Sequence, residues 1–300
     1  MENRTDCKST AFSSTLRMNC RGRELKIDHP LIMGIMNLTP DSFYDGGFYP
    51  SQEDMLRHVG QMIRDGAEIV DLGAVSTRPG SVGVSPQEEE DRLLPALDMI
   101  RKQFPEIFLS VDTYRSEIAR KAIDLGADMI NDISAGRFDP AMIPVLKGYG
   151  IPYIMMHMQG QPANMQHDPF YEDVLGEVRH FFEGRIAEAA REGIQDLIID
   201  PGFGFGKTVE HNYLLLAHLE QFLALGRPVM VGLSRKSMIN RILGTNPTHA
   251  LNGTTVLNTI AILKGAHILR VHDVREAAEA MKLCREYVTA IEAPYRANDN

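Results

Sequence analysis

The sequence predicts an α/β fold, a (β/α)8 TIM barrel formed by a single domain, and three observations lead to this prediction. Short apolar, β-prone segments alternate with longer amphipathic segments, which predicts parallel strands joined by helices. There are eight such segments, and nearly every one ends in a polar residue. The predicted strands lie near residues 31–37, 68–73, 107–112, 128–133, 151–157, 196–200, 228–234 and 267–272.

The polar residues at the strand ends favour a closed barrel over an open, doubly wound sheet. In an open sheet such groups concentrate at one switch point, whereas here they follow nearly every strand. In a barrel they all meet at the carboxyl end of the strands, where barrel enzymes carry out their chemistry. The residues concerned are Asn37, Asp71, Asp112, Asn131, His157, Asp200, Ser234 and His272.

Helix boundaries between the predicted strands follow known capping chemistry. Ser51 is a predicted N-cap for the amphipathic stretch from Gln52 to Arg64, because its hydroxyl can accept a hydrogen bond from a free backbone N–H group. Gly66 is predicted to end this helix in a left-handed conformation. Similar glycines follow later helical stretches, so a helix separates each strand from its successor and the strands must pair in parallel.

We expect three regions along the 300 residues. Residues 1–24 are a polar N-terminal extension with a possible hairpin, because the segment from Phe12 to Ile27 contains an Arg-Gly-Arg turn at Arg21–Arg23. This short hairpin could close the barrel bottom. Residues 25–292 form the barrel domain, and residues 293–300 form a flexible tail. One barrel of this kind typically holds about 250 residues, so a second domain is not needed.

Composition and charge argue against several classes of protein. A net charge of −9 and a pI near 5.6 disfavour a nucleic-acid binder, since phosphate backbones select basic faces. The first two dozen residues contain no continuous apolar stretch, so we expect neither a signal peptide nor a membrane span. Cys7, Cys20 and Cys284 are odd in number and lack metal-ligand spacing. A reduced cytoplasmic location is the simplest expectation.

The most specific local string runs from Asp200 to Thr208 and reads DPGFGFGKT. It is not a P-loop, because Pro201 stands where that pattern requires glycine, and it does not match G-x-G-x-x-G either. In one interpretation the string forms a ligand wall, that is, one side of a ligand-binding pocket. Its carboxylate is then followed by a backbone that a flat ligand can approach. The other interpretation is a tight turn. We favour the wall because Phe203 and Phe205 are costly to leave on a bare loop.

Asp112, Asn131 and Asp200 end different strands and are expected to face one pocket. Carboxylates and amides in an apolar cup suit a heterocycle with a guanidine-like edge, because they can accept from adjacent N–H donors. The alternative is that these residues only cap the following helices; Asp112, which precedes Thr113, is a plausible N-cap. Their grouping favours the ligand interpretation.

A cationic corner is predicted after the last two strands. The string SRKS at 234–237 follows the seventh strand, where barrels often bind phosphate. Arg270 and His272 lie on one face of the eighth strand by two-residue alternation. Together these residues could hold pyrophosphate or a carboxylate. The alternative is ion pairing with Asp273 or surface acids, which could account for one cation more readily than for all of them.

Two long segments follow the first and second strands, at 39–47 and 74–80. They exceed the few residues that a βα turn needs, so we expect movable lids over the barrel mouth rather than inert connections. Around His157, the methionines at 155, 156 and 158 are expected to line the pocket, because no second ligand has the spacing of a metal or haem site.

With these motifs in hand, the chain resembles the dihydropteroate synthases from about His29 to Glu292. The ordered motifs are GIMNLTPDSFYDGG, STRPG, SVDTY, NDIS, MHMQG, DPGFGFGK, SRKS and RVHD. The resemblance implies an enzyme that joins 6-hydroxymethyl-7,8-dihydropterin pyrophosphate to p-aminobenzoate and releases pyrophosphate, with Mg²⁺ as cofactor. It also implies a homodimer, whose partners are small-molecule substrates rather than nucleic acid or membrane. Late barrel helices, such as Gly253–Lys264, could form its interface, although core packing explains their apolar residues equally well.

The resemblance also implies roles for individual residues. Catalysis would depend on Asn37, Lys236, Arg270 and His272. The pterin would be bound by Asp112, Asn131, Met156, Asp200, Phe205, Lys236 and Arg270. The pyrophosphate would be bound by Asn37, Arg270 and His272, and Mg²⁺ by Asn37 and Asp45. The p-aminobenzoate would be bound by Phe43, Thr77, Arg78, Pro79 and Ser237, while Asp71 would support the second loop.

One departure from the family pattern is visible. The family usually has Gly-Glu before Ser-Thr-Arg-Pro-Gly, whereas this chain has Ala74-Val75, which restricts the backbone and removes a carboxylate. We therefore expect altered closure of the second loop and a shifted apparent affinity for p-aminobenzoate or sulfonamides. The alternatives are a catalytically silent pterin-binding paralogue and an enzyme like the methyltetrahydrofolate:corrinoid methyltransferases.

Overall fold

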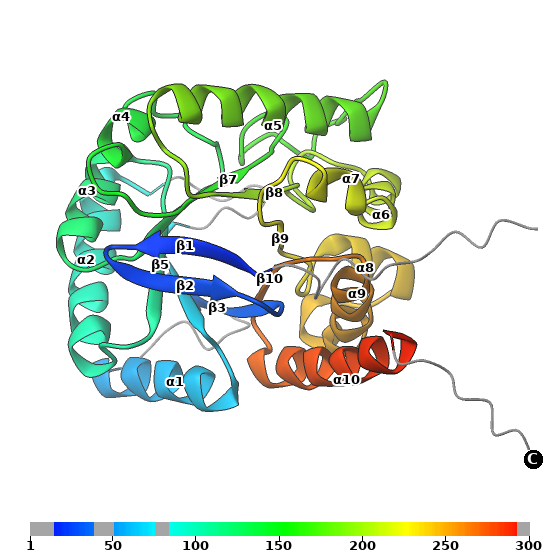
Figure 1. Ribbon diagram of the computed structural model, residues 1–300, viewed down its shortest axis with the longest axis horizontal. Helices are drawn as coiled ribbons and strands as arrows, with labels where there is room; N and C mark the ends of the chain where they lie inside the picture. Colours follow the sequence, from blue (N-terminus) through cyan, green and yellow to red (C-terminus); the bar gives the residue numbers. More distant parts are fainter. Residues whose placement is uncertain (1–14, 39–50, 76–83, 293–300) are drawn as a thin grey trace, which may run out of the picture.

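A computed structural model describes residues 15–38, 51–75 and 84–292 of the chain (Figure 1). Ten strands and the helices between them are arranged as a ring of parallel strands, surrounded by helices, with a separate hairpin across the centre of the view. Within these ranges, none of the helices is long and apolar enough to cross a membrane.

The predicted barrel is confirmed by an eight-stranded parallel sheet in the order β8-β7-β6-β5-β4-β3-β10-β9. Its strands are shorter than the predicted segments at most ends, because the ladder stops where the polar ends turn into loops. Their bounds are β3 Leu31–Asn37, β4 Ile69–Gly73, β5 Phe108–Asp112, β6 Met129–Asp132, β7 Tyr153–Met156, β8 Leu197–Asp200, β9 Met230–Val231 and β10 Ile268–Val271.

The ring closes between β8 and β9. The last ladder is a single parallel bridge between Ile199 and Val229, supported by a 3.0 Å hydrogen bond from the Ile199 N–H to the carbonyl of Pro228. The seventh predicted strand, 228–234, therefore forms a ladder of only two residues, Met230 and Val231. This closure brings the carboxyl ends of all eight strands to one end of the barrel.

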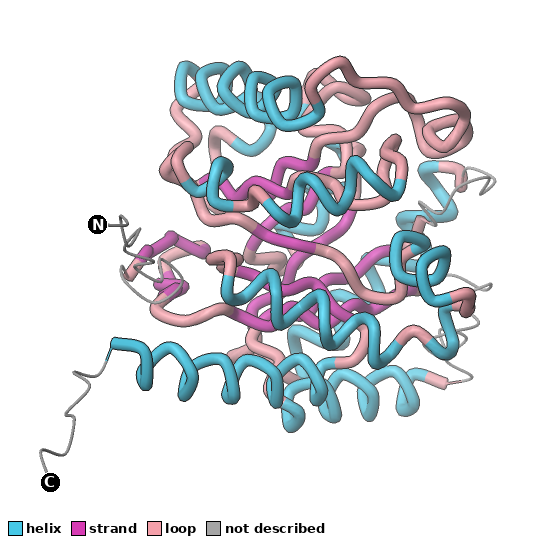
Figure 2. Tube along the Cα trace, turned by 90° about the vertical axis from the view of Figure 1, so that its right-hand side faces the viewer, coloured by secondary structure: helices cyan, strands magenta, loops and turns pink. Residues whose placement is uncertain are grey.

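The predicted hairpin is present and covers the amino end of the barrel strands, as the side view in Figure 2 shows. Strands β1 (Leu16–Cys20) and β2 (Arg23–Ile27) pair antiparallel through a turn at Arg21 and Gly22, both with positive φ. Its buried face and the lower barrel interior form one apolar cluster, which consists of Met18, Cys20, Leu25, Ile27, Leu31, Met33, Ile69, Met129, Ile154, Ile198, Met230 and Ile268. The barrel is therefore a packed core at this end, with no pore.

Helices cover the outside of the ring and bury the outward-facing residues of the strands, such as Val70 and Leu109, in a second and larger core. The predicted caps of the first helix are confirmed, since Ser51 accepts a 3.1 Å hydrogen bond from the Asp54 N–H and Gly66 is left-handed. The helices are α1 Gln52–Asp65, α2 Pro86–Gln103, α3 Ser116–Asp124, α4 Met142–Leu146, α5 Val174–Arg191, α6 Val209–Ala217, α7 Glu220–Leu223, α8 Ser237–Leu243, α9 Leu251–Leu263 and α10 Val274–Glu292, with a 3₁₀ turn at Pro247–His249.

Candidate active site

Strand register places predicted site residues in one row at the carboxyl end of the barrel. Asn37 pairs with Gly73 across β3 and β4, Gly73 pairs with Asp112, and Asp112 pairs with Asn131. Further round the ring, Met156 pairs with Asp200. Parallel pairing without a register slip therefore brings together residues that are far apart in the sequence.

Arg270 connects this row across the barrel interior. Its Nε donates to Asp71 Oδ2 at 2.6 Å, and one of its terminal nitrogens donates to Asp112 Oδ2 at 2.8 Å. The side-chain amide of Asn131 donates to the same oxygen of Asp71 at 3.1 Å. Asp71 is fully buried, and its other oxygen, Oδ1, has no hydrogen-bond partner. The predicted support of the second loop by Asp71 stays a prediction, since the partners seen are Arg270 and Asn131.

The helix-cap alternative for Asp112 is wrong. Helix α3 begins at Ser116, its N-cap position is Arg115, and no side chain caps it. The Ser116 N–H is instead bound by Asp139 at 2.7 Å. Asp112 thus remains available at the strand end, where its described partner is Arg270.

Asp200 and Lys236 form the opposite side of the mouth. Asp200 is buried, and its Oδ1 accepts a 2.8 Å hydrogen bond from the Gly202 N–H. The Lys236 ammonium donates to the carbonyl of Phe203 and lies 4.7 Å from the centre of the Phe205 ring, which is a cation–π distance. The aromatic ring and the carboxylate are thereby fixed beside one cation.

The charges at the mouth shift one another's titration. Burial raises the pKa of Asp200, with Lys236 and the Gly202 hydrogen bond opposing it. Burial likewise raises the pKa of Asp112, with Arg270 opposing it and the neighbouring carboxylates adding to it. Burial lowers the pKa of Lys236 to about 8, against the attraction of Asp200. Such mutual perturbation is typical of functional sites.

The guanidinium of Arg270 behaves differently from that of Lys236. Burial opposes its charge, but the attached carboxylates of Asp71 and Asp112 outweigh burial and raise its pKa. Arg270 is therefore a permanent cation held in a fixed plane by two aspartates. A planar guanidinium in this setting can stack on a flat ligand, whereas a flexible ammonium cannot.

The glycine-rich loop after β8 forms the tight turn that was the alternative interpretation. Gly202 and Gly206 have positive φ, and a Cβ on either would lie 1.9 Å from the His157 carbonyl oxygen or 2.3 Å from that of Gln159. The glycines thus allow close approach to the neighbouring loop. The expectation that Phe203 belongs to a ligand wall is wrong, because it lies fully buried in the outer core. Phe205 is half-buried and keeps the wall interpretation as a prediction.

Met156 and Phe205 meet in a small apolar cluster near the mouth. The cluster consists of Ile133, Met156, Met158 and Met165, with Tyr114, Phe138 and Phe205 packed against it. Because it borders Asp200 and the Asp112–Asn131 row, it supplies the apolar surface that the sequence predicted around the polar groups. Methionine side chains adapt easily to the edge of a flat ligand.

The cationic corner is only partly as predicted. Arg235 forms a two-point ion pair with Asp273, at 3.0 and 2.5 Å, so this cation is engaged in the way the alternative allowed. His272 Nδ1 is 2.9 Å from the Ser234 hydroxyl. Lys236 immediately precedes α8, and Ser237 is the exposed first residue of that helix. Lys236, Arg270 and His272 remain as the groups that could face an anion.

Lys207 was missed as a site-forming residue. The residue is 3% exposed, and its ammonium binds the imidazole of His157 and carbonyl oxygens of both mouth loops, those of His157, Gly202 and Phe205. The signal was present in the string DPGFGFGK, which ends in a lysine on an apolar loop. Its role could not be predicted from the string, because the role depends on contacts with backbone carbonyls of two loops.

Several predicted residues lie outside the described ranges, and their roles stay predictions. They are Phe43, Asp45, Thr77, Arg78 and Pro79. Within the described ranges, no group of three His, Cys, Asp or Glu side chains could hold a metal ion. Asn37, the remaining predicted Mg²⁺ ligand, ends β3 beside Gly73.

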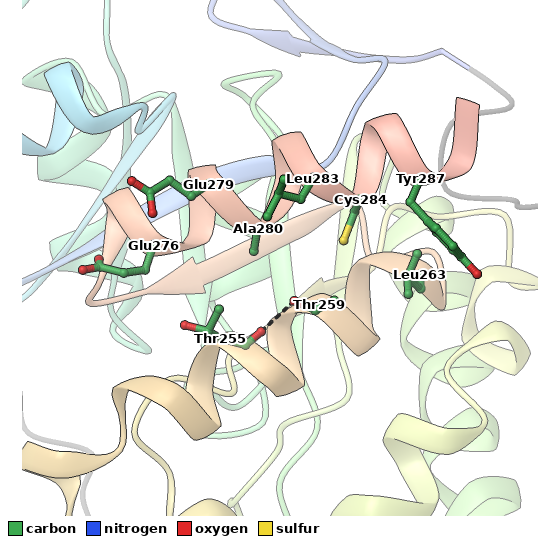
Figure 3. Close-up of a pocket in the computed structure, with 9 residues that line it drawn as sticks. All are labelled: Thr255, Thr259, Leu263, Glu276, Glu279, Ala280, Leu283, Cys284 and Tyr287. Atoms are coloured by element: carbon green, nitrogen blue, oxygen red, sulfur yellow. Dashed lines mark hydrogen bonds between the residues drawn. The ribbon is translucent and has the colours of Figure 1, made fainter. Parts of the chain in front are cut away.

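A cavity of about 460 Å³ lies elsewhere, on the outer surface between α9 and α10 (Figure 3). Its lining residues all belong to these two helices and include Thr255, Leu263, Leu283, Cys284 and Tyr287. It is mostly apolar and contains none of the predicted site residues. It is therefore a feature of the helical surface, separate from the barrel mouth.

Comparison with known proteins agrees with this geometry. The family model described as "Pterin binding enzyme" matches residues 33–272, and the chain belongs to this family. Among its relatives, the dihydropteroate synthase of Escherichia coli (strain K12) is 43% identical over 279 residues, which is 92% of this chain and 98% of the relative. That of Haemophilus influenzae is 42% identical, covering 89% and 98%. Within the pterin-binding enzymes, the chain thus groups with the dihydropteroate synthases.

Solved structures place the chain in the same group. The dihydropteroate synthase of Yersinia pestis, in complex with a sulfonamide drug, superposes with a TM-score of 0.88 at 40% identity, over 91% of this chain and all of that one. The enzyme of Xanthomonas albilineans with 4-aminobenzoic acid gives 0.85 at 39% identity, over 94% and 100%. At these values both the fold and the family are shared.

Proposed function

We propose that the chain joins 6-hydroxymethyl-7,8-dihydropterin pyrophosphate to p-aminobenzoate, giving 7,8-dihydropteroate and pyrophosphate in folate synthesis. It is thus a transferase. The observation that carries the proposal is the network of Asp71, Asp112, Asn131 and Arg270 at the strand ends, facing Asp200 and Lys236, in a chain 43% identical to the dihydropteroate synthase of Escherichia coli.

The pterin half of the site follows from the chemistry of these groups. A pterin presents adjacent N–H donors on one edge and a flat π surface on its faces. Asp112, Asn131 and Asp200 supply acceptors for the edge, while Arg270 and the Met156–Phe205 wall supply surfaces for the faces. Lys236 would bind a ring acceptor, since its ammonium lies 4.7 Å from the centre of the Phe205 ring and is attracted by Asp200.

The difficult step is departure of the pyrophosphate. The bond between the pterin methylene carbon and the pyrophosphate oxygen breaks, and its electron pair leaves with the pyrophosphate. The amine nitrogen of p-aminobenzoate then bonds to that carbon and loses a proton. An arylamine is already neutral, so the main demand is stabilisation of the leaving charge, which Arg270, His272 and Asn37 would provide.

Mg²⁺ fits this arrangement as a partner of the leaving group. The amide oxygen of Asn37 is a hard donor of the kind that Mg²⁺ prefers, and Mg²⁺ in such sites takes its other ligands from phosphates and water. Asn37, with Asp45 as the second proposed ligand, would hold the ion, which would neutralise charge on the pyrophosphate. For p-aminobenzoate, Ser237 at the start of α8 is the described residue of the proposed set.

The test is incubation of the purified chain with both substrates and Mg²⁺, followed by measurement of pyrophosphate and dihydropteroate. We expect equal amounts of the two products. A protein that binds the pterin substrate and releases no pyrophosphate would be a silent paralogue. Transfer of a methyl group from methyltetrahydrofolate to a corrinoid, without pyrophosphate release, would support the methyltransferase alternative.

The homodimer and the cytoplasmic location are further parts of the proposal. Exposed apolar side chains on α8, α9 and α10 favour a second copy as the occupant of this face; they are Ile242, Leu243, Val256, Leu283, Tyr287 and Ile291. Leu283→Arg should shift the sedimentation of the protein to that of a monomer. Phe170→Arg, which changes an equally exposed side chain of another segment, should leave it unchanged. Cys20 and Cys284 are free thiols, as a reduced compartment allows.

A further inference from the structure

Lys207 is a buried cation to which the proposed reaction assigns no step. Its ammonium lies 2.9 Å from the Gly202 carbonyl oxygen, 3.1 Å from that of Phe205, and 3.3 Å from that of His157. The Nδ1 atom of His157 is the fourth neighbour, at 3.0 Å. Burial lowers the pKa of Lys207 well below the usual lysine value, with Asp200 opposing it, whereas the three carbonyls can only accept and favour the ammonium form, which offers three donors.

His157 completes this environment as a neutral ring. Burial is the main cause that lowers the pKa of His157 to about 2, and the nearby charge of Lys207 adds to it. The imidazole is fixed by an edge-on contact with Phe181, with ring centres 4.9 Å apart. A neutral ring that accepts at Nδ1 from Lys207 carries its proton on Nε2.

The loop that Lys207 binds is the one that carries the pterin-facing residues. Gly202 donates to Asp200, Phe205 is part of the apolar wall, and His157 directly follows Met156. Each carbonyl from Gly202 to Gly206 accepts a side-chain hydrogen bond. The donors, in chain order of the carbonyls, are Lys207, Lys236, Gln166, Lys207 and Tyr171.

Helix α6 holds the same loop from its other end. Thr208 caps α6 in a reciprocal arrangement with His211. Asn212 accepts from the Gly204 N–H at 2.6 Å and donates to the Thr208 carbonyl at 2.5 Å. Lys207 therefore lies between the start of α6 and the loop after β8. Among the described residues, no other cation connects this loop to the loop after β7.

We propose that Lys207 is a positioning residue for the pterin half of the site: it holds the loops after β7 and β8 together, so that Met156, Asp200 and Phe205 face one pocket. It acts through these residues and does not touch the substrate. The inference rests on the proposed function, because it assigns Lys207 to one of the two substrates. Ser237 and the p-aminobenzoate side are on other loops, so Lys207 should leave them unaffected.

The experiment compares Lys207→Met with Arg101→Met. Arg101 is also a mostly buried cation that binds backbone carbonyls, but it lies at the amino end of the strands, beside Asp128. We would measure the Kd of the pterin pyrophosphate with Mg²⁺ by calorimetry, and the KM of p-aminobenzoate at saturating pterin substrate. Circular dichroism gives the folded fraction of each variant.

In folded Lys207→Met, the Kd of the pterin substrate should rise about 10- to 100-fold, because small misplacements of binding groups have effects of this size. The KM of p-aminobenzoate should stay within about 2-fold. Arg101→Met should leave both constants within about 2-fold per folded molecule. Unchanged pterin affinity in folded Lys207→Met, or an equal loss for both substrates, would overturn the proposal.

A second pair of variants decides the matter if Lys207→Met does not fold. His157→Leu removes one acceptor of Lys207, whereas His157→Asn can present an oxygen near the position of Nδ1. We expect weaker pterin binding in His157→Leu than in His157→Asn, and equal affinities would overturn the proposal. Failure of the proposed function itself is distinguishable, because the unaltered chain would then release no pyrophosphate from the two substrates.

Discussion

At the amino end of the barrel two arginines hold one aspartate, whereas at the carboxyl end two aspartates share one arginine. Asp128 accepts from Arg23 at 2.8 Å, from Arg101, and from the Leu109 N–H at 2.8 Å. Arg270 serves both Asp71 and Asp112, and Asp71 keeps one oxygen without a partner. The lower cluster is satisfied internally, while the upper one has an excess of acceptors that a ligand with N–H donors can use.

The surroundings of the two clusters also differ: those at the amino end are apolar, and those at the carboxyl end contain charged groups with shifted pKa values. The amino end is closed by the hairpin, whose apolar side chains fill the barrel floor. The carboxyl end combines buried carboxylates with raised pKa values and a lysine with a lowered one. Burial of charge by itself therefore does not indicate function. The balance between donors and acceptors separates the stabilising cluster from the candidate site.

The largest effect is expected for Arg270→Met. The substitution leaves the buried Asp71 and the partly buried Asp112 without their cation, so the free energy of unfolding should fall by about 3–5 kcal/mol. Turnover per folded molecule should fall at least about 100-fold, because the leaving charge loses its stabilisation. Urea denaturation and pyrophosphate release measure the two quantities. Arg101→Met is the control, with a loss of about 1–3 kcal/mol and unchanged turnover; equal turnover in the two variants would contradict the contrast between the ends.

A smaller effect is expected for Asp200→Asn. Loss of a charged acceptor for the pterin should weaken pterin binding about 10- to 100-fold. Stability should not fall, because the change removes a buried carboxylate whose pKa burial has raised. The matched change at the other end, Asp128→Asn, should lower stability and spare binding. Calorimetric titration and thermal melting test both, and a destabilised Asp200→Asn would count against the comparison.

The pH dependence should show Lys236 acting in opposite directions on activity and stability. Its pKa is lowered by burial from 10.5 to about 8, so kcat/KM should decline as pH rises above about 8. Between about 8 and 10.5 the unfolded chain binds more protons at this group than the folded chain does. The contribution of Lys236 to stability therefore increases with pH across this window and stays at its lower value below it.

A pH profile of Lys236→Arg provides the control, since arginine stays protonated over this range. The decline of kcat/KM above pH 8 should be absent in this variant, although its absolute rate should be lower. A decline that persists unchanged would assign the titration to another group.

The smallest effect is expected from the paired change Ala74→Gly and Val75→Glu. Ala74 is fully buried, and Arg92 approaches its carbonyl at 3.5 Å. A glycine adds backbone freedom worth about 0.4–1 kcal/mol, so the KM of p-aminobenzoate should shift about 2- to 5-fold. The Kd of the pterin substrate should not change. Identical steady-state kinetics of the variant and the original chain would dispose of the idea.

The sequence predicted the barrel well because its signal is local and repeated. Nearly every predicted strand is an apolar run that ends in a polar residue, and glycines such as Gly66 and Gly244 end some of the helices, so a wrong boundary at one element leaves the others unaffected. The grouping of Asp112, Asn131 and Asp200 followed from the same regularity, since parallel strands bring their carboxyl ends together. The hairpin was visible from the turn at Arg21–Arg23.

The partners of the site residues could not be predicted in the same way. The contact of Arg270 with Asp71 joins residues 199 positions apart across the barrel interior, and no sequence period encodes it. The pairing of Arg235 with Asp273 depends on a left-handed backbone at Arg235, a conformation that its residue type does not suggest. The role of Lys207 depends on carbonyl groups, which every residue carries and no sequence pattern distinguishes.

The single bridge between Ile199 and Val229 gives the barrel a seam. On one side of this seam lies Asp200, and on the other lies the short segment from β9 to Lys236, so a pterin held by both would fasten the ring where it is thinnest. Amide hydrogens along β8 and β9 should then exchange with solvent more slowly when the ligand is bound. Ligand binding at the barrel mouth should therefore lower the frequency with which the barrel opens between β8 and β9.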